Sequence, residues 1–290
     1  MKFTRKKMLR LMATSAAGIS LMPSLSFSAL AQAQATLKGN INHSVCRWCY
    51  GRIPLDELSV AAKNLGIKSV ELLDPHEWPV VIKHGLTCAI ANGSPLHITK
   101  GFNDAQYHEQ LKKDYFDLIS KAADHGLKQI ICFSGNRNGI SNEQGWEQCA
   151  RGLEPVVKLA ERHNILVVME LLNSKVDHAD YQCDNTAWGA KLVDKIGSAN
   201  FKLLYDIYHM QIMEGDVIAT IRKYKDYISH YHTGGVPGRG EIDHTQELNY
   251  AAICKAIVES GYKGFVAQEF IPKRPDPINS LKEAINICDV

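Results

Sequence analysis

From residue 40 onward, the sequence repeats one pattern, in which a short apolar run ends in polar or turn residues and a longer amphipathic stretch follows. The short runs have the length of buried strands, and the longer stretches place apolar residues three and four positions apart, as helices do. Strands that alternate with helices form parallel sheets that the helices cover. The predicted strands cover residues 41–49, 69–73, 87–91, 129–133, 166–171, 202–206, 230–233 and 265–269.

The predicted helices have recognisable ends. The stretch 54–65 begins with Pro54 and stops before Gly66, which suits the preference for proline in the first turn and glycine after the last. The other predicted helices cover residues 78–83, 105–125, 147–163, 186–196, 217–227, 247–260 and 277–288. Eight strand–helix units in a chain of this length match a closed (β/α)8 TIM barrel better than an open sheet. The sequence therefore predicts an α/β fold with one barrel domain, residues 36–290.

The first 35 residues differ from the barrel in charge and in pattern. Five basic residues and no acidic one precede or begin an apolar, small-residue stretch, and alanines at 29, 31, 33 and 35 offer small-x-small cleavage sites. This order is typical of an export signal. The run from Thr4 to Arg10 resembles a twin-arginine signal, with Lys6 at the place of the second arginine. We predict that residues 1–35 are a signal and that the chain is exported to the periplasm.

A membrane anchor is the alternative interpretation of the same segment. Gly18, Pro23 and five serines interrupt the apolar run, whereas a membrane span needs about 20 predominantly apolar residues. We therefore expect no stable membrane insertion of the mature chain, and the sequence leaves open whether the signal is cleaved or retained.

Charge and cysteine content narrow the classes of protein further. Without the signal, 28 basic residues face 31 acidic ones, and no basic stripe is present, so nucleic-acid binding is not expected. The eight cysteines are scattered, several within apolar runs, which indicates buried free thiols. Cys46 and Cys49 form the one CxxC pair, and the sequence does not determine whether they join. It also leaves a homo-oligomer open.

Four successive predicted strands end in side chains that an apolar core does not tolerate. The carboxyl ends of barrel strands meet at one face, so these side chains are expected to converge there. A buried carboxylate needs a partner or a metal ion. Three carboxylates and an imidazole suit Mn²⁺ or Mg²⁺, while Co²⁺ and Zn²⁺ are alternatives. The predicted metal ligands are Glu170, Asp206, His232 and Glu269.

The same segments carry a resemblance to a known family. ELLN at Glu170, YDIYHMQ at Asp206, HYHTGGVPGRGEID at His232 and AQEF at Glu269 resemble the hydroxypyruvate isomerase group of the xylose-isomerase-like barrels. The resemblance covers residues 40–285. The third ligand is often glutamine in that group, whereas His232 stands here, as in the related ketose 3-epimerases.

The resemblance implies roles for six residues. Glu170 and Glu269 would bind the metal and act as the acid/base pair, and Asp206 and His232 would complete the metal set. By the same resemblance, His209 and Arg239 would contact the substrate. Near the first two predicted strand ends, the candidates to line a pocket are Trp48, Tyr50, His76 and Trp78. After the third and fourth predicted strands, the candidates to supply hydrogen bonds are Asn92, Ser94, Ser134 and Asn136.

These groups predict an isomerase that acts on a small α-hydroxycarbonyl compound. A divalent ion acidifies the C–H next to a carbonyl, and two carboxylates can then move the proton through an enediolate. Hydroxypyruvate would give tartronate semialdehyde. The alternatives are a ketose 3-epimerase, another sugar-modifying enzyme on the same barrel, or a non-catalytic sugar-binding protein.

Overall fold

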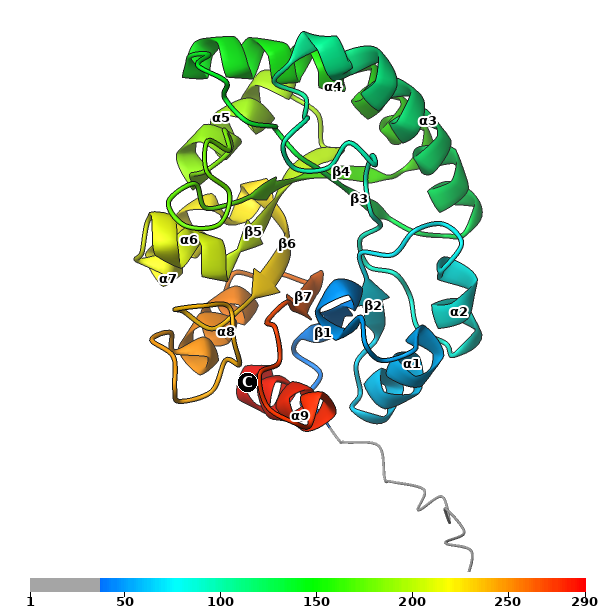
Figure 1. Cartoon of the computed structure of the whole chain (residues 1–290), viewed down its shortest axis with the longest axis vertical. Coiled ribbons are helices and arrows are strands. Elements are labelled where there is room, and N and C mark those ends of the chain that lie inside the picture. Colours follow the sequence, from blue (N-terminus) through cyan, green and yellow to red (C-terminus); the bar gives the residue numbers. More distant parts are fainter. Residues whose placement is uncertain (1–36) are drawn as a thin grey trace, which may run out of the picture. The chain divides into compact units, whose positions relative to one another are not determined.

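Parallel strands surround a common axis, and the helices cover their outer side (Figure 1). The computed structural model describes residues 37–290, so the predicted signal, residues 1–35, lies outside the described residues. The sheet has the order β2-β1-β7-β6-β5-β4-β3, in which neighbours along the chain are mostly neighbours in space. Its strands are β1 (Asn42–Cys46), β2 (Ser69–Glu71), β3 (Gln129–Cys132), β4 (Leu166–Leu171), β5 (Phe201–Asp206), β6 (Ile228–Thr233) and β7 (Phe265–Gln268).

Residues 87–91 occupy the eighth strand position without forming a regular strand. Thr87 bridges β2, and Ala91 bridges both Leu73 and Ile130, so the segment closes the ring between β2 and β3. Between these bridges the Ala89 amide donates to the Ser69 hydroxyl at 2.8 Å instead of to a neighbouring main chain. The ladder is interrupted there. The predicted barrel is present, but the regular strand predicted at 87–91 is wrong.

Successive side chains along each strand point alternately into the barrel interior and into the layer beneath the helices. In β4, Val167 and Met169 pack into the large core between strands and helices. Val168 points the other way and packs with Ile90, Ile131 and Leu204 inside the ring. This alternation is the period of two that strands impose. Further along β4 the inward position falls on Glu170, so polar groups begin where the apolar interior ends.

The helices agree with the predicted ones, with two exceptions. The fourth helix begins at Asn142, five residues before the predicted start, because Ser141 and Gln144 form a capping box. A helix that the pattern did not predict starts directly after β5, where the Asp206 side chain accepts from the His209 amide. The helices are α1 (Leu55–Asn64), α2 (Trp78–Lys83), α3 (His108–Asp124), α4 (Asn142–His163), α5 (Thr186–Ile196), α6 (Ile207–Met213), α7 (Val217–Tyr224), α8 (Tyr250–Glu259) and α9 (Pro277–Cys288).

The first strand is shorter than predicted. β1 stops at Cys46, and a 3₁₀ helix, η2 (Arg47–Tyr50), carries the chain across the top of the barrel. Cys46 is buried inside the ring and Cys49 lies in η2. All eight cysteines are free, which agrees with the free thiols expected for the scattered ones and shows Cys46 and Cys49 unpaired, a point that the sequence left open. No helix among residues 37–290 is long and apolar enough to cross a membrane.

Candidate metal centre and active site

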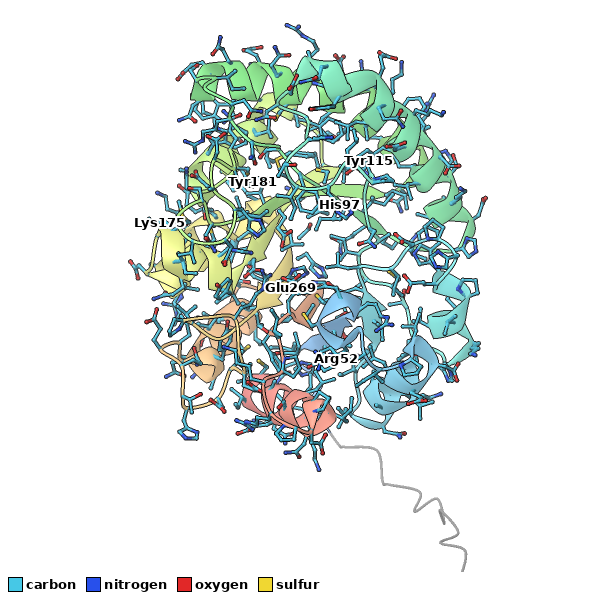
Figure 2. All side chains as sticks on the ribbon, viewed as in Figure 1. Arg52, His97, Tyr115, Lys175, Tyr181 and Glu269 are labelled. Carbon is cyan, nitrogen blue, oxygen red and sulfur yellow. The ribbon has the colours of Figure 1, made fainter. Side chains whose placement is uncertain are left out.

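Four neighbouring strands bring one side chain each to the same point. Glu170 belongs to β4, Asp206 ends β5, His232 lies in β6 and Glu269 follows β7 directly. One donor atom from each lies within 4.8 Å of the donor atoms of the others. All four side chains are buried. Figure 2 shows Glu269 within the ring of strands. The strands are parallel, so their carboxyl ends share one rim and the four groups meet there.

Hydrogen bonds and ion pairs hold three of these groups in place. The Nδ1 atom of His232 lies 2.8 Å from Glu269 Oε2 and 3.4 Å from Glu170 Oε1. Arg239 Nη2 donates to Asp206 Oδ2 at 2.9 Å and also pairs with Glu269 Oε2. The other Asp206 oxygen, Oδ1, accepts from the His209 amide at 3.1 Å, which is the N-cap bond of α6.

The arrangement fits a divalent cation. Glu170 Oε1 is buried and makes no hydrogen bond to any group in residues 37–290. Three carboxylates face this point, and the cationic groups beside them are Arg239 and, when protonated, His232. Carboxylate oxygens with one imidazole nitrogen form a donor set that Mn²⁺ and Mg²⁺ accept. The structure therefore contains a group that could hold such an ion, and its chemistry does not select one metal.

The two carboxylates that line the cavity and belong to the cluster, Glu170 and Glu269, differ in acidity. Burial raises the pKa of Glu170, and the negative charge of Glu269 adds to that effect. Burial acts on Glu269 in the same sense, but Arg239 and His232 outweigh it and hold the pKa of Glu269 well below its usual value. The difference follows from the position of Arg239, which contacts Glu269 and not Glu170.

Arg239 and His209 lie together beside the cluster. Arg239 lines the cavity described below, between the rings of Trp48 and Tyr208, 5.2 and 5.1 Å from their centroids. His209 is buried behind it and does not line that cavity. Its Nδ1 atom lies 2.6 Å from the Asn173 amide nitrogen, and its Nε2 atom lies 3.0 Å from Arg239 Nη1. The structure thus places His209 against Arg239, while a substrate contact of its ring stays a prediction.

A cavity of about 500 Å³ opens beside the four side chains. Glu170, Glu269 and Arg239 form its polar end. Leu72, Ile131, Phe133 and Leu172 form an apolar wall. Of the candidate residues, three border the cavity, Trp48, Asn92 and Ser94, and five do not, Tyr50, His76, Trp78, Ser134 and Asn136. His178 borders it as well and was not expected from the sequence. A polar end beside an apolar wall is the usual constitution of a small-molecule site.

Two contacts of the cluster were not foreseen. Trp48 Nε1 donates to Glu269 Oε1 at 2.8 Å, so this tryptophan also orients a member of the cluster. Glu71, the last residue of β2, lies inside the ring with Oε1 2.9 Å from His232 Nε2. Glu71 is a carboxylate at the end of a buried strand, as Glu170 is. The predicted strand 69–73 placed Glu71 in its middle, so the rule of polar strand ends did not select it, whereas β2 ends at Glu71.

Comparison with known proteins agrees with the fold. The family model described as "Xylose isomerase-like TIM barrel" matches residues 60–288. Hydroxypyruvate isomerase of Escherichia coli is 35% identical over 223 residues, 73% of this chain and 86% of that protein. The 2-oxo-tetronate isomerase of Cupriavidus necator is 27% identical over 233 residues, 76% of this chain and 87% of that protein.

Solved structures show the same barrel. The AP endonuclease, family 2, from Brucella melitensis aligns with a TM-score of 0.76 at 22% identity, covering 83% of this chain and 97% of that one. D-psicose 3-epimerase from Clostridium cellulolyticum aligns with a TM-score of 0.66 at 19% identity, covering 84% and 90%. At these identities the likeness concerns the fold.

The strands of this barrel bring three carboxylates and an imidazole together at their carboxyl ends. The proteins to which the chain is similar include isomerases and an epimerase. The chain belongs to the xylose isomerase-like TIM barrel family. Within that family its relatives include hydroxypyruvate isomerases, and the predicted assignment to an isomerase is confirmed.

Proposed function

We propose that this protein is a divalent-metal-dependent isomerase that converts hydroxypyruvate to tartronate semialdehyde. The convergence of Glu170, Asp206, His232 and Glu269 beside a cavity is the observation that carries the proposal. The relatives named hydroxypyruvate isomerase and 2-oxo-tetronate isomerase support a small hydroxy-keto substrate.

In this proposal the four side chains hold the ion, with Mn²⁺ or Mg²⁺ preferred. When bound, such an ion supplies Lewis-acid polarisation of the substrate carbonyl. Glu170 and Glu269 come from β4 and β7 and both line the cavity. One carboxylate takes the proton from a substrate carbon, and the other returns a proton to the adjacent carbon. Proton transfer of this kind typically contributes about 10²–10⁴-fold to the rate.

Arg239 and Trp48 assist these steps without exchanging protons. Trp48 and Arg239 hold the two oxygens of Glu269, so its carboxylate keeps one orientation toward the cavity. The Arg239 guanidinium also brings a positive charge to the polar end of the cavity, where a carboxylate of the substrate would lie. His209 supports Arg239 from behind, and the proposal assigns it to substrate positioning.

A ketose 3-epimerase, or another reaction on a sugar, is the second candidate. The cavity, about 500 Å³, lies within the range of roughly 300–1,000 Å³ that suits ligands much larger than a three-carbon acid. His232 at the third ligand position favours the same candidate, because glutamine is frequent there in the hydroxypyruvate isomerase group. In an epimerase the proton would return to the same carbon on its other face.

Deuterium exchange tests both candidates. The purified protein, supplied with Mn²⁺ or Mg²⁺, is incubated in D₂O with hydroxypyruvate and a panel of ketoses. Incorporation at a substrate carbon is expected for one of them, and NMR of the product distinguishes isomerisation from epimerisation. Glu170→Gln and Glu269→Gln variants should lose the exchange. Binding of a sugar with no exchange in the parent protein would refute catalysis and favour a non-catalytic sugar-binding protein.

We also propose that residues 1–35 direct the protein to the periplasm and that the barrel begins at residue 36. A twin-arginine-type route would carry a chain that has already folded and acquired its ion. Cell fractionation followed by N-terminal sequencing tests this proposal. Uncleaved protein found in the cytoplasm alone would contradict it.

A further inference from the structure

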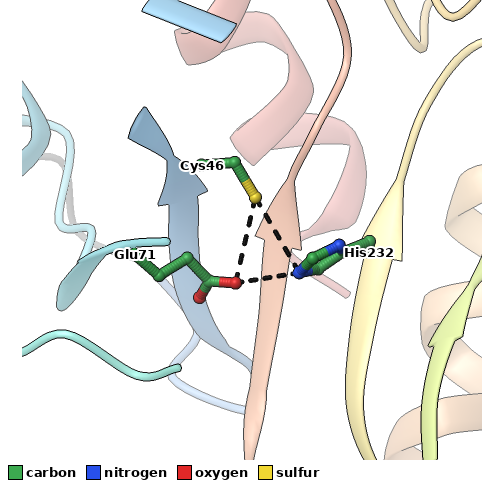
Figure 3. Close-up of side chains that lie close together, drawn as sticks. All are labelled: Cys46, Glu71 and His232. Atoms are coloured by element: carbon green, nitrogen blue, oxygen red, sulfur yellow. Dashed lines mark hydrogen bonds and ion pairs between the residues drawn. The ribbon is translucent and has the colours of Figure 1, made fainter. Parts of the chain in front are cut away.

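Below the four converging side chains lies a second polar group inside the barrel. Glu71 is fully buried, and its Oε1 atom lies 2.7 Å from His230 Nε2 and 2.9 Å from His232 Nε2. His230 and His232 are two positions apart on β6, so both rings point inward. The Cys46 thiol lies 3.8 Å from both Glu71 Oε1 and His232 Nε2, as Figure 3 shows.

The hydrogen bond between Glu71 and His232 determines where the imidazole carries its proton. An ionised carboxylate only accepts hydrogen bonds, so His232 Nε2 must be the donor. Nδ1 lies 2.8 Å from the Glu269 carboxylate, so in the metal-free structure it donates as well. A bound ion would take the place of that Nδ1 proton, and the imidazole, still protonated at Nε2, would then have its lone pair at Nδ1. Nδ1 is the atom that faces Glu170 and Glu269, at 3.4 and 2.8 Å. The bond to Glu71 therefore directs the lone pair of His232 toward the point where the carboxylates meet.

His230 holds Glu71 in the position that this bond requires. Its Nε2 atom donates to the same oxygen, Oε1, and no hydrogen bond to Oε2 is formed within residues 37–290. Two nitrogen donors and the more distant Cys46 thiol on one oxygen leave the carboxylate little freedom to rotate. Because Glu71 is buried, water does not compete for these bonds, and charged hydrogen bonds of this kind are about twice as strong as neutral ones.

We propose that Glu71 is a positioning residue for the metal centre, which acts through His232 by fixing its Nε2–H tautomer and its ring orientation. The inference rests on the proposed metal-dependent function. Carboxylates behind metal-binding histidines serve in this way in many proteins, and their loss typically weakens metal binding by about 10–100-fold.

Mn²⁺ affinity, measured by calorimetric titration, tests the proposal without any assay of activity. Glu71→Gln keeps the volume of the side chain and removes its charge, and we expect the affinity to fall by about 10–100-fold. Glu71→Asp draws the carboxylate back by about 1.5 Å, the length of one C–C bond, and should cause a smaller loss. It serves as the test if the glutamine variant does not fold.

Ser69→Ala is the matched control. Ser69 lies two residues before Glu71 on β2, is equally buried and accepts from the Ala89 amide. Within residues 37–290, no hydrogen bond joins its side chain to any of the four converging side chains. We expect this variant to lose stability and to keep its Mn²⁺ affinity within about twofold, the effect of a residue that matters to the fold alone. An equal loss of affinity in Ser69→Ala and Glu71→Gln would overturn the proposal.

Nitrogen NMR of ¹⁵N-histidine-labelled protein, saturated with diamagnetic Mg²⁺, examines the tautomer directly. His232, assigned by comparison with His232→Gln, should be protonated at Nε2 and not at Nδ1, and its Nε2–H signal should shift in Glu71→Gln. Protonation at Nδ1, or a signal that Glu71→Gln leaves unmoved, would refute the proposal.

The number of bound ions separates this proposal from a competing one. Cys46, Glu71 and His232 also offer donor atoms within 4.8 Å of one another, so they could themselves hold an ion. We expect one Mn²⁺ or Zn²⁺ per chain. A second ion that is lost in Cys46→Ser would overturn the proposal, because Glu71 would then be a ligand. If the parent protein binds no divalent ion, the proposed function fails as well, whereas unchanged affinity in both Glu71 variants refutes this inference alone.

Discussion

Replacing Glu170 by glutamine should stabilise the metal-free protein and remove most of its response to Mn²⁺. In the metal-free protein this carboxylate is buried, its Oε1 atom has no hydrogen bond within residues 37–290, and Glu269 lies across the same site. An amide of the same size has no charge to desolvate. Glu170, the ligand of the proposed metal centre, is therefore expected to reduce the stability of the barrel when no ion is bound.

The size of both effects can be worked from the structure. A glutamine also leaves a buried polar atom, so the gain comes from the charge that is no longer desolvated, less the ion pair of Glu170 Oε1 with His232 Nδ1 at 3.4 Å. We expect a net gain of about 1 kcal/mol, the low end of the roughly 1–3 kcal/mol that burying an unpaired polar group costs in proteins. For a domain of this size that raises Tm by about 2–4 °C. In the parent, Mn²⁺ at 100 times its Kd adds about 2.7 kcal/mol. A hundredfold loss of affinity would reduce that contribution to about 0.4 kcal/mol at the same concentration.

Thermal unfolding with EDTA and with Mn²⁺ measures both quantities. The parent should unfold about 5–10 °C higher with Mn²⁺, and Glu170→Gln should unfold only about 1 °C higher. Asp74→Asn is the control, because Asp74 also lines the cavity but lies outside the four converging residues, and it should respond as the parent does. A Glu170→Gln protein that is less stable than the parent in EDTA and still responds fully to Mn²⁺ would refute the reasoning.

Three further predictions concern other residues. Burial, with Lys68 adding to it, lowers the pKa of His43 from 6.5 to about 4. As the pH falls, the unfolded chain therefore binds a proton at His43 before the folded protein does, and urea titrations should show the free energy of unfolding falling by up to about 3 kcal/mol between pH 6.5 and 4. His43→Leu should reduce that fall. Trp48→Phe removes the 2.8 Å bond to Glu269 and should lower kcat about tenfold with little change in Tm, because a charged hydrogen bond contributes roughly 1.5–3 kcal/mol; an unchanged kcat would show that this bond does not orient Glu269. Tyr181→Phe removes a buried hydroxyl that accepts from the Ser134 amide and donates to the Glu170 carbonyl, both at 3.0 Å. Urea unfolding should show that the free energy of unfolding falls by about 2–3 kcal/mol, and a fall below about 0.5 kcal/mol would contradict that role.

The local sequence pattern predicted most strands and helices of the barrel, but it failed at particular elements. α5 and α9 have the predicted bounds because their caps, Asn185 and Asp276, and their apolar faces are local features. The segment 87–91 has the apolar composition of a strand, but the Ser69 hydroxyl, from another strand, takes one of its amides. α6 follows β5 without a loop, so no turn residue separates the helix from the strand before it.

The candidate site likewise contains residues that the sequence predicted and contacts that it did not. A carboxylate or an imidazole at the end of a buried strand is visible in sequence, and parallel strands bring their ends to one rim. Glu170, Asp206, His232 and Glu269 were therefore predictable as a group. Glu71 ends a strand of only three residues, and its partner His232 lies 161 positions away. The Arg239 contacts depend on a loop whose path no local pattern specifies.

Periodicity and residue type by themselves determined that this chain forms a parallel barrel and which strand ends carry the candidate metal ligands, because both depend on neighbours along the chain. Tertiary structure alone decided that His232 Nδ1 faces the carboxylates, that Arg239 contacts Glu269 rather than Glu170, and that the barrel closes without a regular eighth strand. These features depend on hydrogen bonds between residues far apart in sequence, whose partners are specified only once the barrel has closed.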